Sequence, residues 1–137
     1  MPAPKDTALS IGLLALRLGA GGLLLLGHGW PKLMQWEQKS LTFADPLGVG
    51  PAVSLGLVIF AEVACALLVM IGFATRWALV PILVFFAVAI FMQHAGQPFA
   101  ERELAMIYAV PFVALMFTGP GRFALDGHYG PKLRFGK

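Results

Sequence analysis

The chain has 137 residues, of which 58% are hydrophobic and only 12% are charged, and its formal net charge is +3. A soluble domain carries about 25% charged residues, so the composition excludes an ordinary soluble protein and predicts a membrane protein. The basic residues cluster in the loops and the tail, which indicates contact with lipid headgroups, and no nucleic-acid motif is present.

The apolar residues fall into four blocks, and a helix of about 20 apolar residues crosses the hydrocarbon of a bilayer. We therefore predict an all-α membrane protein, a single domain over residues 1–137 whose four transmembrane helices form an antiparallel bundle. The predicted spans are residues 8–28, 51–73, 76–95 and 99–118, followed by a basic cytoplasmic tail at 119–137.

The first span is predicted to be a retained helix rather than a signal peptide, because its apolar block is longer than a signal core and contains Arg17. One face of this helix carries small residues, which allow another helix to approach closely. They are Ala8, Gly12, Ala15, Gly19 and Gly22. Ordinary helix packing and a docking face for a partner span are both consistent with this pattern.

The segment between the first two spans contains Trp30 and Trp36, and tryptophan is enriched at the headgroup level of membranes. We expect either a short interfacial helix or an irregular loop between spans one and two.

The second span carries one charge, Glu62, near its middle. A charge at that depth costs about 2.5–3.5 kcal/mol, so it usually faces the bundle interior and a partner. Arg17 is about nine residues inside span one and Glu62 about eleven residues inside span two, which predicts an ion pair at matched depth. This pair would form a polar core that binds a ligand or relays protons, or it would be a salt bridge that fixes helix register.

The chain has one cysteine, Cys65, which excludes an intrachain disulfide and a CxxC redox pair. Any redox chemistry therefore needs a bound cofactor or a partner protein.

A second polar group is predicted at the opposite, outer boundary of the membrane, where His28, His94, Glu101 and Glu103 lie near the ends of their spans. Two histidines and a carboxylate can bind a metal or hydrogen-bond the carbonyls of a quinone, and boundary side chains can also simply be hydrated. The spacing matches no metal motif, so we predict no metal site.

Lysine and arginine counts predict the topology. One side has six of these residues and the other has three, and the positive-inside rule then places both termini in the cytoplasm.

Several motifs in order along the chain resemble the DoxX family of small four-span bacterial and archaeal membrane proteins. The matching residues are Arg17-Leu18-Gly19, His28-Gly29-Trp30-Pro31-Lys32-Leu33, Glu62, Gly72-Phe73-Ala74-Thr75-Arg76, Glu103-Leu104-Ala105 and Gly119-Pro120-Gly121-Arg122-Phe123-Ala124-Leu125-Asp126. Some relatives are subunits of a thiosulfate:quinone oxidoreductase, and others are linked to oxidoreductase assemblies in oxidative-stress defence. The resemblance implies a redox or quinone context in a bacterial or archaeal inner membrane.

These observations lead to two hypotheses. The first is a quinone-linked membrane component of a redox system, in which the cofactor-binding residues are Arg17, His28, Glu62, His94 and Glu103. The second is a non-catalytic scaffold or assembly partner. The expected partners are the lipid bilayer, soluble or membrane oxidoreductase subunits and a second copy of the chain. No catalytic residue is identified.

Overall fold

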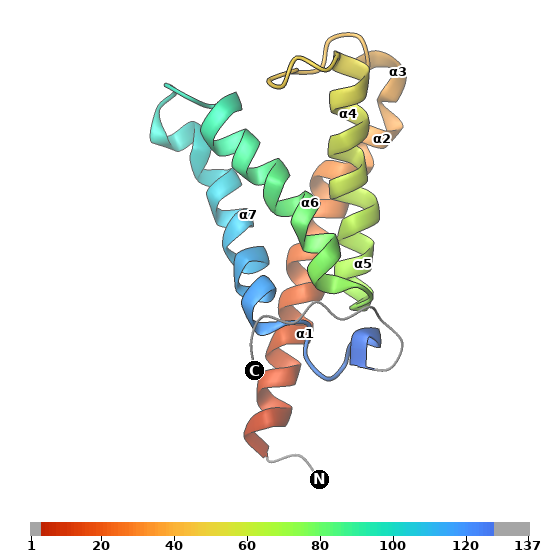
Figure 1. Ribbon diagram of the computed structural model, residues 1–137, viewed down its shortest axis with the longest axis vertical. Helices are drawn as coiled ribbons and strands as arrows, with labels where there is room; N and C mark the ends of the chain where they lie inside the picture. The colour runs from red at the N-terminus through yellow and green to blue at the C-terminus, as the bar shows by residue number, and fades with distance from the viewer. Residues whose placement is uncertain (1–3, 128–137) are drawn as a thin grey trace.

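The computed structural model describes residues 4–127, and these residues form helices and connecting turns without any β-strand (Figure 1). The helical segments are α1 (Pro4–Leu24), η1 (Leu25–Gly29), α2 (Trp30–Met34), α3 (Trp36–Lys39), α4 (Pro51–Ile59), η2 (Phe60–Cys65), α5 (Ala66–Ile71), α6 (Thr75–Val88), η3 (Ala89–Gln93), α7 (Phe99–Thr118) and η4 (Leu125–Gly127). The segments η1, η2 and η3 are π-helical turns that continue their neighbouring α-helices. The predicted all-α architecture is confirmed for the described part of the chain.

Three of the continuous helices in the described part are long and apolar enough to cross a membrane. They are Thr7–Met34, Pro51–Ile71 and Thr75–Gln93. The remaining long helix, α7, has 20 residues and carries Glu101, Arg102 and Glu103 near its start.

The first helix is longer than the sequence predicts. It continues through η1 and past Pro31 to Met34, whereas the predicted span ends at residue 28. The π-helical turn ends at Gly29, directly before α2, and Pro31 occupies the first turn of α2. A proline is tolerated in a first turn, and a π-helical turn changes the local hydrogen-bond pattern, so the helical path is not ended there.

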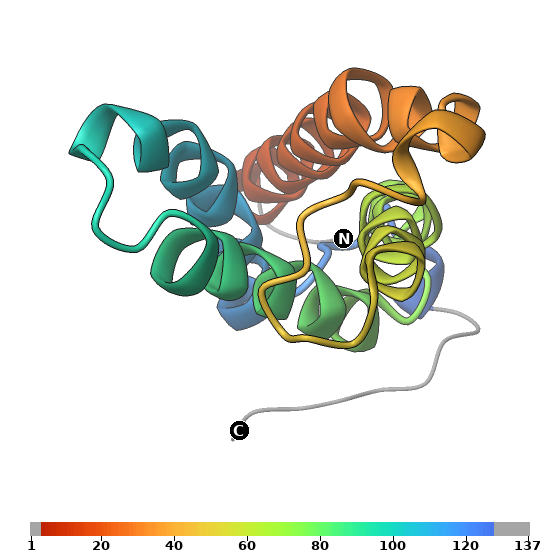
Figure 2. The same cartoon turned by 90° about the horizontal axis from the view of Figure 1, so that it is seen from above.

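The connection between the first two membrane-length helices contains a short helix and an irregular loop. The short helix α3 follows α2, and residues 40–50 then form an irregular loop before α4. Seen from above, this loop passes across the end of the molecule between α4 and α6 (Figure 2).

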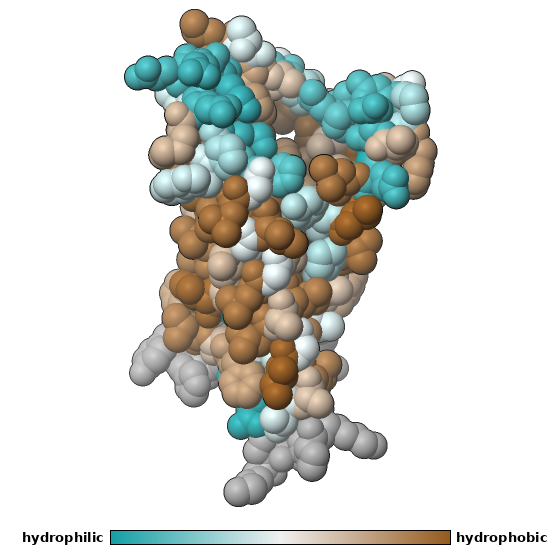
Figure 3. Space-filling view, turned by 180° about the vertical axis from the view of Figure 1, so that it is seen from behind, coloured by the Kyte–Doolittle hydropathy of each residue, from teal (hydrophilic) through white to brown (hydrophobic). Residues whose placement is uncertain are grey.

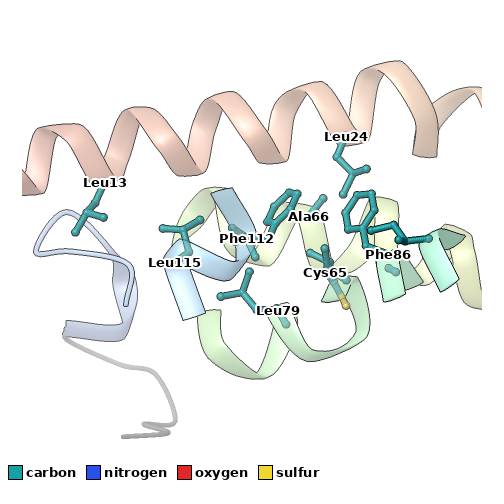
Figure 4. Close-up of a cluster of buried hydrophobic side chains, with 13 residues drawn as sticks. Leu13, Leu24, Cys65, Ala66, Leu79, Phe86, Phe112 and Leu115 are labelled. Atoms are coloured by element: carbon teal, nitrogen blue, oxygen red, sulfur yellow. The ribbon is translucent and has the colours of Figure 1, made fainter. Parts of the chain in front are cut away.

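The helices lie close together at one end of the molecule and spread apart at the other (Figure 1). α1 packs along α5 and contacts α7, while α6 packs against both α7 and η2. The buried core lies where these helices meet, with Leu24 of α1 facing Ala66 and Phe86 (Figure 4). Apolar side chains therefore fill the space between these helices around Leu24, Ala66 and Phe86.

The outer surface is divided in a way that suits a bilayer. Apolar residues cover the middle of the face in Figure 3, and hydrophilic residues gather at the end that carries α3 and the α6–α7 connection. Large apolar side chains are exposed on several helices, including Leu26, Phe91 and Phe117, each more than 70% exposed. An exposed apolar surface of this kind marks a surface covered by lipid or protein.

Candidate functional site

The loop at residues 40–50 is held in place by one carboxylate. Asp45 accepts hydrogen bonds from the hydroxyl of Ser54 at 2.7 Å and from the backbone N–H groups of Gly50 at 2.8 Å and Val49 at 3.0 Å. The bond from Ser54, followed by the backbone N–H groups, lowers the pKa of Asp45 below its usual value. The loop is thus tied to the first turn of α4.

Beneath this loop lies a cavity of about 530 Å³, between α4 and η2 on one side and α6 and η3 on the other. The residues that line it are Lys32, Phe43, Ala44, Pro46, Leu47, Ser54, Leu57, Val58, Phe60, Pro81, Val84, Phe85, Val88, Ala89, Gln93 and His94. Four of them, Lys32, Ser54, Gln93 and His94, are polar, and the others are apolar. Cavities of about 300–1,000 Å³ with apolar walls and few polar groups are typical of small-molecule sites.

Among the described residues, the cavity wall contains one ammonium group, that of Lys32. Its Nζ lies 2.8 Å from Oε2 of Glu62 and donates a second, longer bond of 3.4 Å to the carbonyl oxygen of His28. The Lys32 side chain is 17% exposed and that of Glu62 only 2%. Glu62 therefore lies behind Lys32 and fixes its position at the cavity.

The helix that carries Glu62 is pressed closely against the first helix. A methyl group at Gly29 would lie 2.7 Å from the carbonyl oxygen of Glu62 and 2.8 Å from its carbonyl carbon. Only glycine fits this contact without a shift of one helix. Gly29 thus places η1 and η2 in the register that brings Lys32 to Glu62.

The predicted ion pair between Arg17 and Glu62 is wrong. The Arg17 guanidinium instead donates to backbone carbonyls, at 2.9 Å to Met70, 3.0 Å to Phe123 and 3.4 Å to Val69. The depth argument failed because it assumed that the first helix ends near residue 28. Gly29 is level with Glu62 in the structure, and Arg17 is twelve residues earlier, about 18 Å away along the axis at about 1.5 Å per residue.

Around Arg17 the chain forms a compact turn that joins three parts of the sequence. The carboxylate of Asp126 accepts hydrogen bonds from the backbone N–H groups of Ala74 at 2.6 Å and Thr75 at 2.9 Å. The backbone N–H of Asp126 donates to the carbonyl oxygen of Gly72 at 2.8 Å. Gly72 has φ +75°, and a methyl group there would collide with Ala124. These contacts give the Gly119–Asp126 motif a structural role, since it caps the start of α6.

The other predicted site residues are dispersed. Among the described residues, His94 is the one member of the predicted set that lines the cavity, and its Nδ1 lies 2.8 Å from Oε1 of Gln97. His28 packs edge-on against Tyr108 of α7, with ring centroids 5.1 Å apart. Glu103 is exposed on α7.

Within residues 4–127, no three histidine, cysteine or acidic side chains are grouped closely enough to hold a metal ion. Cys65 is buried in the apolar core.

Sequence reasoning missed the central role of Lys32. The predicted first span ends at residue 28, which places Lys32 in the connection that follows it rather than in the helix. The signal that could have revealed it is the spacing to His28, since residues four apart lie on the same helical face.

Comparison with known proteins supports the resemblance seen in the motifs. The DoxX family model matches residues 12–95, which is more than half of the chain. A Mycobacterium tuberculosis (strain ATCC 25618 / H37Rv) protein, the uncharacterized membrane protein Rv3486, is 31% identical over 122 residues, which cover 77% of this chain and 74% of the relative. No solved structure matches the chain. With a family model and a relative that both cover most of its apolar helices, the chain is a membrane protein that belongs to the DoxX family.

Proposed function

We propose that the chain is an integral membrane component of a redox system that binds a quinone or another lipophilic molecule in the cavity beneath residues 40–50. The observation that carries this proposal is an apolar cavity of about 530 Å³ with one ammonium group, that of Lys32, in its wall. Burial of apolar surface contributes about 25 cal/mol per Å², so the walls favour a ligand that is largely hydrocarbon.

The polar groups of the cavity can form hydrogen bonds with the carbonyl oxygens of a ligand. An ammonium group is a donor only, and the Lys32 ammonium has three N–H bonds. His94 supplies a ring nitrogen elsewhere in the wall, and Ser54 and Gln93 supply further polar groups. A quinone carries carbonyl oxygens on an apolar ring and chain, which agrees with the context that the family resemblance implies.

In this proposal the chain supplies binding, and a partner supplies electrons. Cys65 is the only thiol in the chain and is buried among apolar side chains, so the chain has no dithiol to donate a pair of electrons. A soluble or membrane oxidoreductase subunit that exchanges electrons with the bound quinone completes the system.

The proposal is tested by purification in a mild detergent, with quinone measured in the extract by absorbance and mass spectrometry, followed by titration with a short-chain quinone. Ala89→Trp places a large side chain in the cavity, and we expect it to weaken binding about tenfold or more, which corresponds to about 1.4 kcal/mol. Ala87→Trp is the matched control, because Ala87 is exposed and does not line the cavity. Absence of quinone in the extract together with no binding in the titration contradicts the proposal.

We further propose that α7 is a fourth span, and that the four spans run antiparallel with both termini in the cytoplasm of a bacterial or archaeal inner membrane. The 20 residues of α7 are about long enough to cross a bilayer, and its charged residues are confined to the end where α7 begins. A carboxylate at a helix N-terminus is also favoured by the helix dipole.

A second candidate function is a scaffold that associates with another copy of the chain. The small residues Ala8, Gly12, Ala15 and Gly19 are all exposed, and a methyl group at Gly12 or Gly19 would meet no atom within 4 Å. Two apolar helices associate in membranes through small residues of this kind. Gly19→Leu is expected to convert a dimer to a monomer in cross-linking and light scattering, and an unchanged oligomeric state contradicts this second function.

A further inference from the structure

We propose that Glu62 makes the cavity selective for neutral lipophilic molecules and against lipids with an anionic head, such as ionised fatty acids. This inference rests on the proposed function, because it requires that the cavity bind a lipophilic molecule. It adds the chemical class of the ligand and the residue that determines that class.

The first step in the argument is position. Lys32 lines the cavity, whereas Glu62 does not line it and is buried. The two side chains are joined at 2.8 Å, and the close contact of Gly29 with the Glu62 backbone holds the carboxylate at that place. A ligand head that reaches the Lys32 ammonium therefore also comes close to the buried charge of Glu62.

The second step is charge. The carboxylate of Glu62 balances the ammonium of Lys32, so the pair presents no net charge to a ligand. Lys39 also lies within electrostatic range of Glu62, but Lys39 does not line the cavity. A second anion at Lys32 would lose its hydration, and the Glu62 carboxylate already balances the ammonium that could otherwise compensate for that loss.

The third step is hydrogen bonding. Among the described residues, Lys32 donates to Glu62 and to the carbonyl oxygen of His28, which leaves one of its three N–H bonds for a further acceptor. A neutral carbonyl oxygen can accept that bond without adding a charge to the site. The arrangement thus favours a ketone, quinone or ester over a carboxylate with the same hydrocarbon chain.

The experiment uses two probes that differ in the charge of the head, methyl palmitate and palmitate, at a pH where the acid is ionised. Each probe displaces a short-chain quinone from the purified full-length protein. We expect the wild-type protein to bind the ester about tenfold or more tightly than the acid. Equal affinity for the two probes overturns the inference while leaving the proposed function intact. If neither the quinone nor the ester binds, the proposed function fails and the inference fails with it.

Variants then assign the selectivity to Glu62. Glu62→Gln leaves the ammonium of Lys32 without its counter-charge, and we expect the preference for the ester to disappear or reverse. The Lys32→Gln/Glu62→Gln double variant has neither charge and should keep rejecting palmitate. Glu37→Gln is the matched control, because it removes an exposed carboxylate of α3 that does not line the cavity and should leave the ratio of the two affinities unchanged.

The folded state of each variant is checked by thermal unfolding in detergent. If Glu62→Gln does not fold, Glu62→Met is measured in its place with the same expected result, and the wild-type ratio and the double variant still test whether the site rejects the acid. Tight palmitate binding by the double variant overturns the inference, since no cation at position 32 would then be attracting the acid. An unchanged ratio in folded Glu62→Gln overturns it as well.

Discussion

At the scale of single residues, the two buried charges of the first two spans have separate partners. Arg17 has no exposed surface and donates to three backbone carbonyls, whereas Glu62 accepts from Lys32. Hydrogen bonds from a charged donor contribute about 1.5–3 kcal/mol each in soluble proteins and less in membranes, where the unfolded chain also finds partners. Arg17 therefore joins α1 to the end of α5 and to the Gly119–Asp126 turn.

We expect Arg17→Met to lower the free energy of unfolding by about 2–4 kcal/mol, because it leaves buried carbonyl groups without donors. The exchange Arg17→Glu with Glu62→Arg should not restore stability, since it places each charge among the wrong partners. Thermal unfolding in detergent measures both effects. Arg122→Met, which removes an exposed charge, is the control. A double exchange as stable as the wild type would show that Arg17 and Glu62 do interact.

At the scale of elements, the contact between η1 and η2 depends on one glycine. A methyl group at Gly29 would meet the backbone of Glu62, whereas at Gly19 it would meet nothing within 4 Å. The two glycines lie in the same continuous helix, so they form a matched pair of substitution sites.

Gly19→Ala is expected to stabilise the protein by up to about 1 kcal/mol, because alanine restricts the unfolded chain. Gly29→Ala should destabilise it and also weaken ligand binding, since separation of η1 from η2 pulls Lys32 away from Glu62. Melting temperature and quinone titration report the two effects. If both variants had the same melting temperature and the same quinone affinity, the helices would be able to shift freely at this contact.

The second element with its own prediction is the loop at residues 40–50. The folded state lowers the pKa of Asp45, so its carboxylate stabilises the loop at pH values above about 3.9, the usual value for an aspartate. That stabilisation is lost as the pH falls through the lower folded-state pKa.

We expect Asp45→Asn to lower the melting temperature at neutral pH, by an amount that shrinks as the pH falls below about 3.9. Scans of the wild type and the variant at several pH values measure this difference. A difference that stays constant down to the most acidic pH would contradict a role for the ionised carboxylate.

At the scale of the whole molecule, the apolar middle and the hydrophilic end suggest how the protein sits in a bilayer (Figure 3). The proposed topology places Thr42 outside the cell and Arg122 in the cytoplasm. Both side chains are exposed, and the native Cys65 is buried and can be replaced by alanine in the background.

In intact cells, a membrane-impermeant thiol reagent should label Thr42→Cys and should label Arg122→Cys only after lysis. The positive-inside rule is the physical reason for this orientation. Labelling of Arg122→Cys in intact cells would show that the orientation is reversed, and labelling of both variants would contradict the proposed span count.

The sequence by itself determined the class of structure and the family. Apolar blocks about as long as a bilayer is thick predict membrane helices regardless of how those helices pack. The reason is that backbone N–H and C=O groups in lipid must be hydrogen-bonded within the chain, and a helix satisfies them. The motifs from Arg17 to Asp126 indicated the DoxX family, because a motif can be recognised in the sequence without knowledge of the contacts that its residues make.

Only the tertiary structure decided which charges meet. That choice depends on how far one helix is shifted along its neighbour, and a shift of a few residues moves a side chain by several ångströms. The shift is determined by the contact of Gly29 with Glu62 and by a helix that continues beyond Pro31, and neither feature can be read from local sequence. The cavity also depends on tertiary structure, because its walls come from α4, η2, α6 and η3 together with the loop that Asp45 ties to α4.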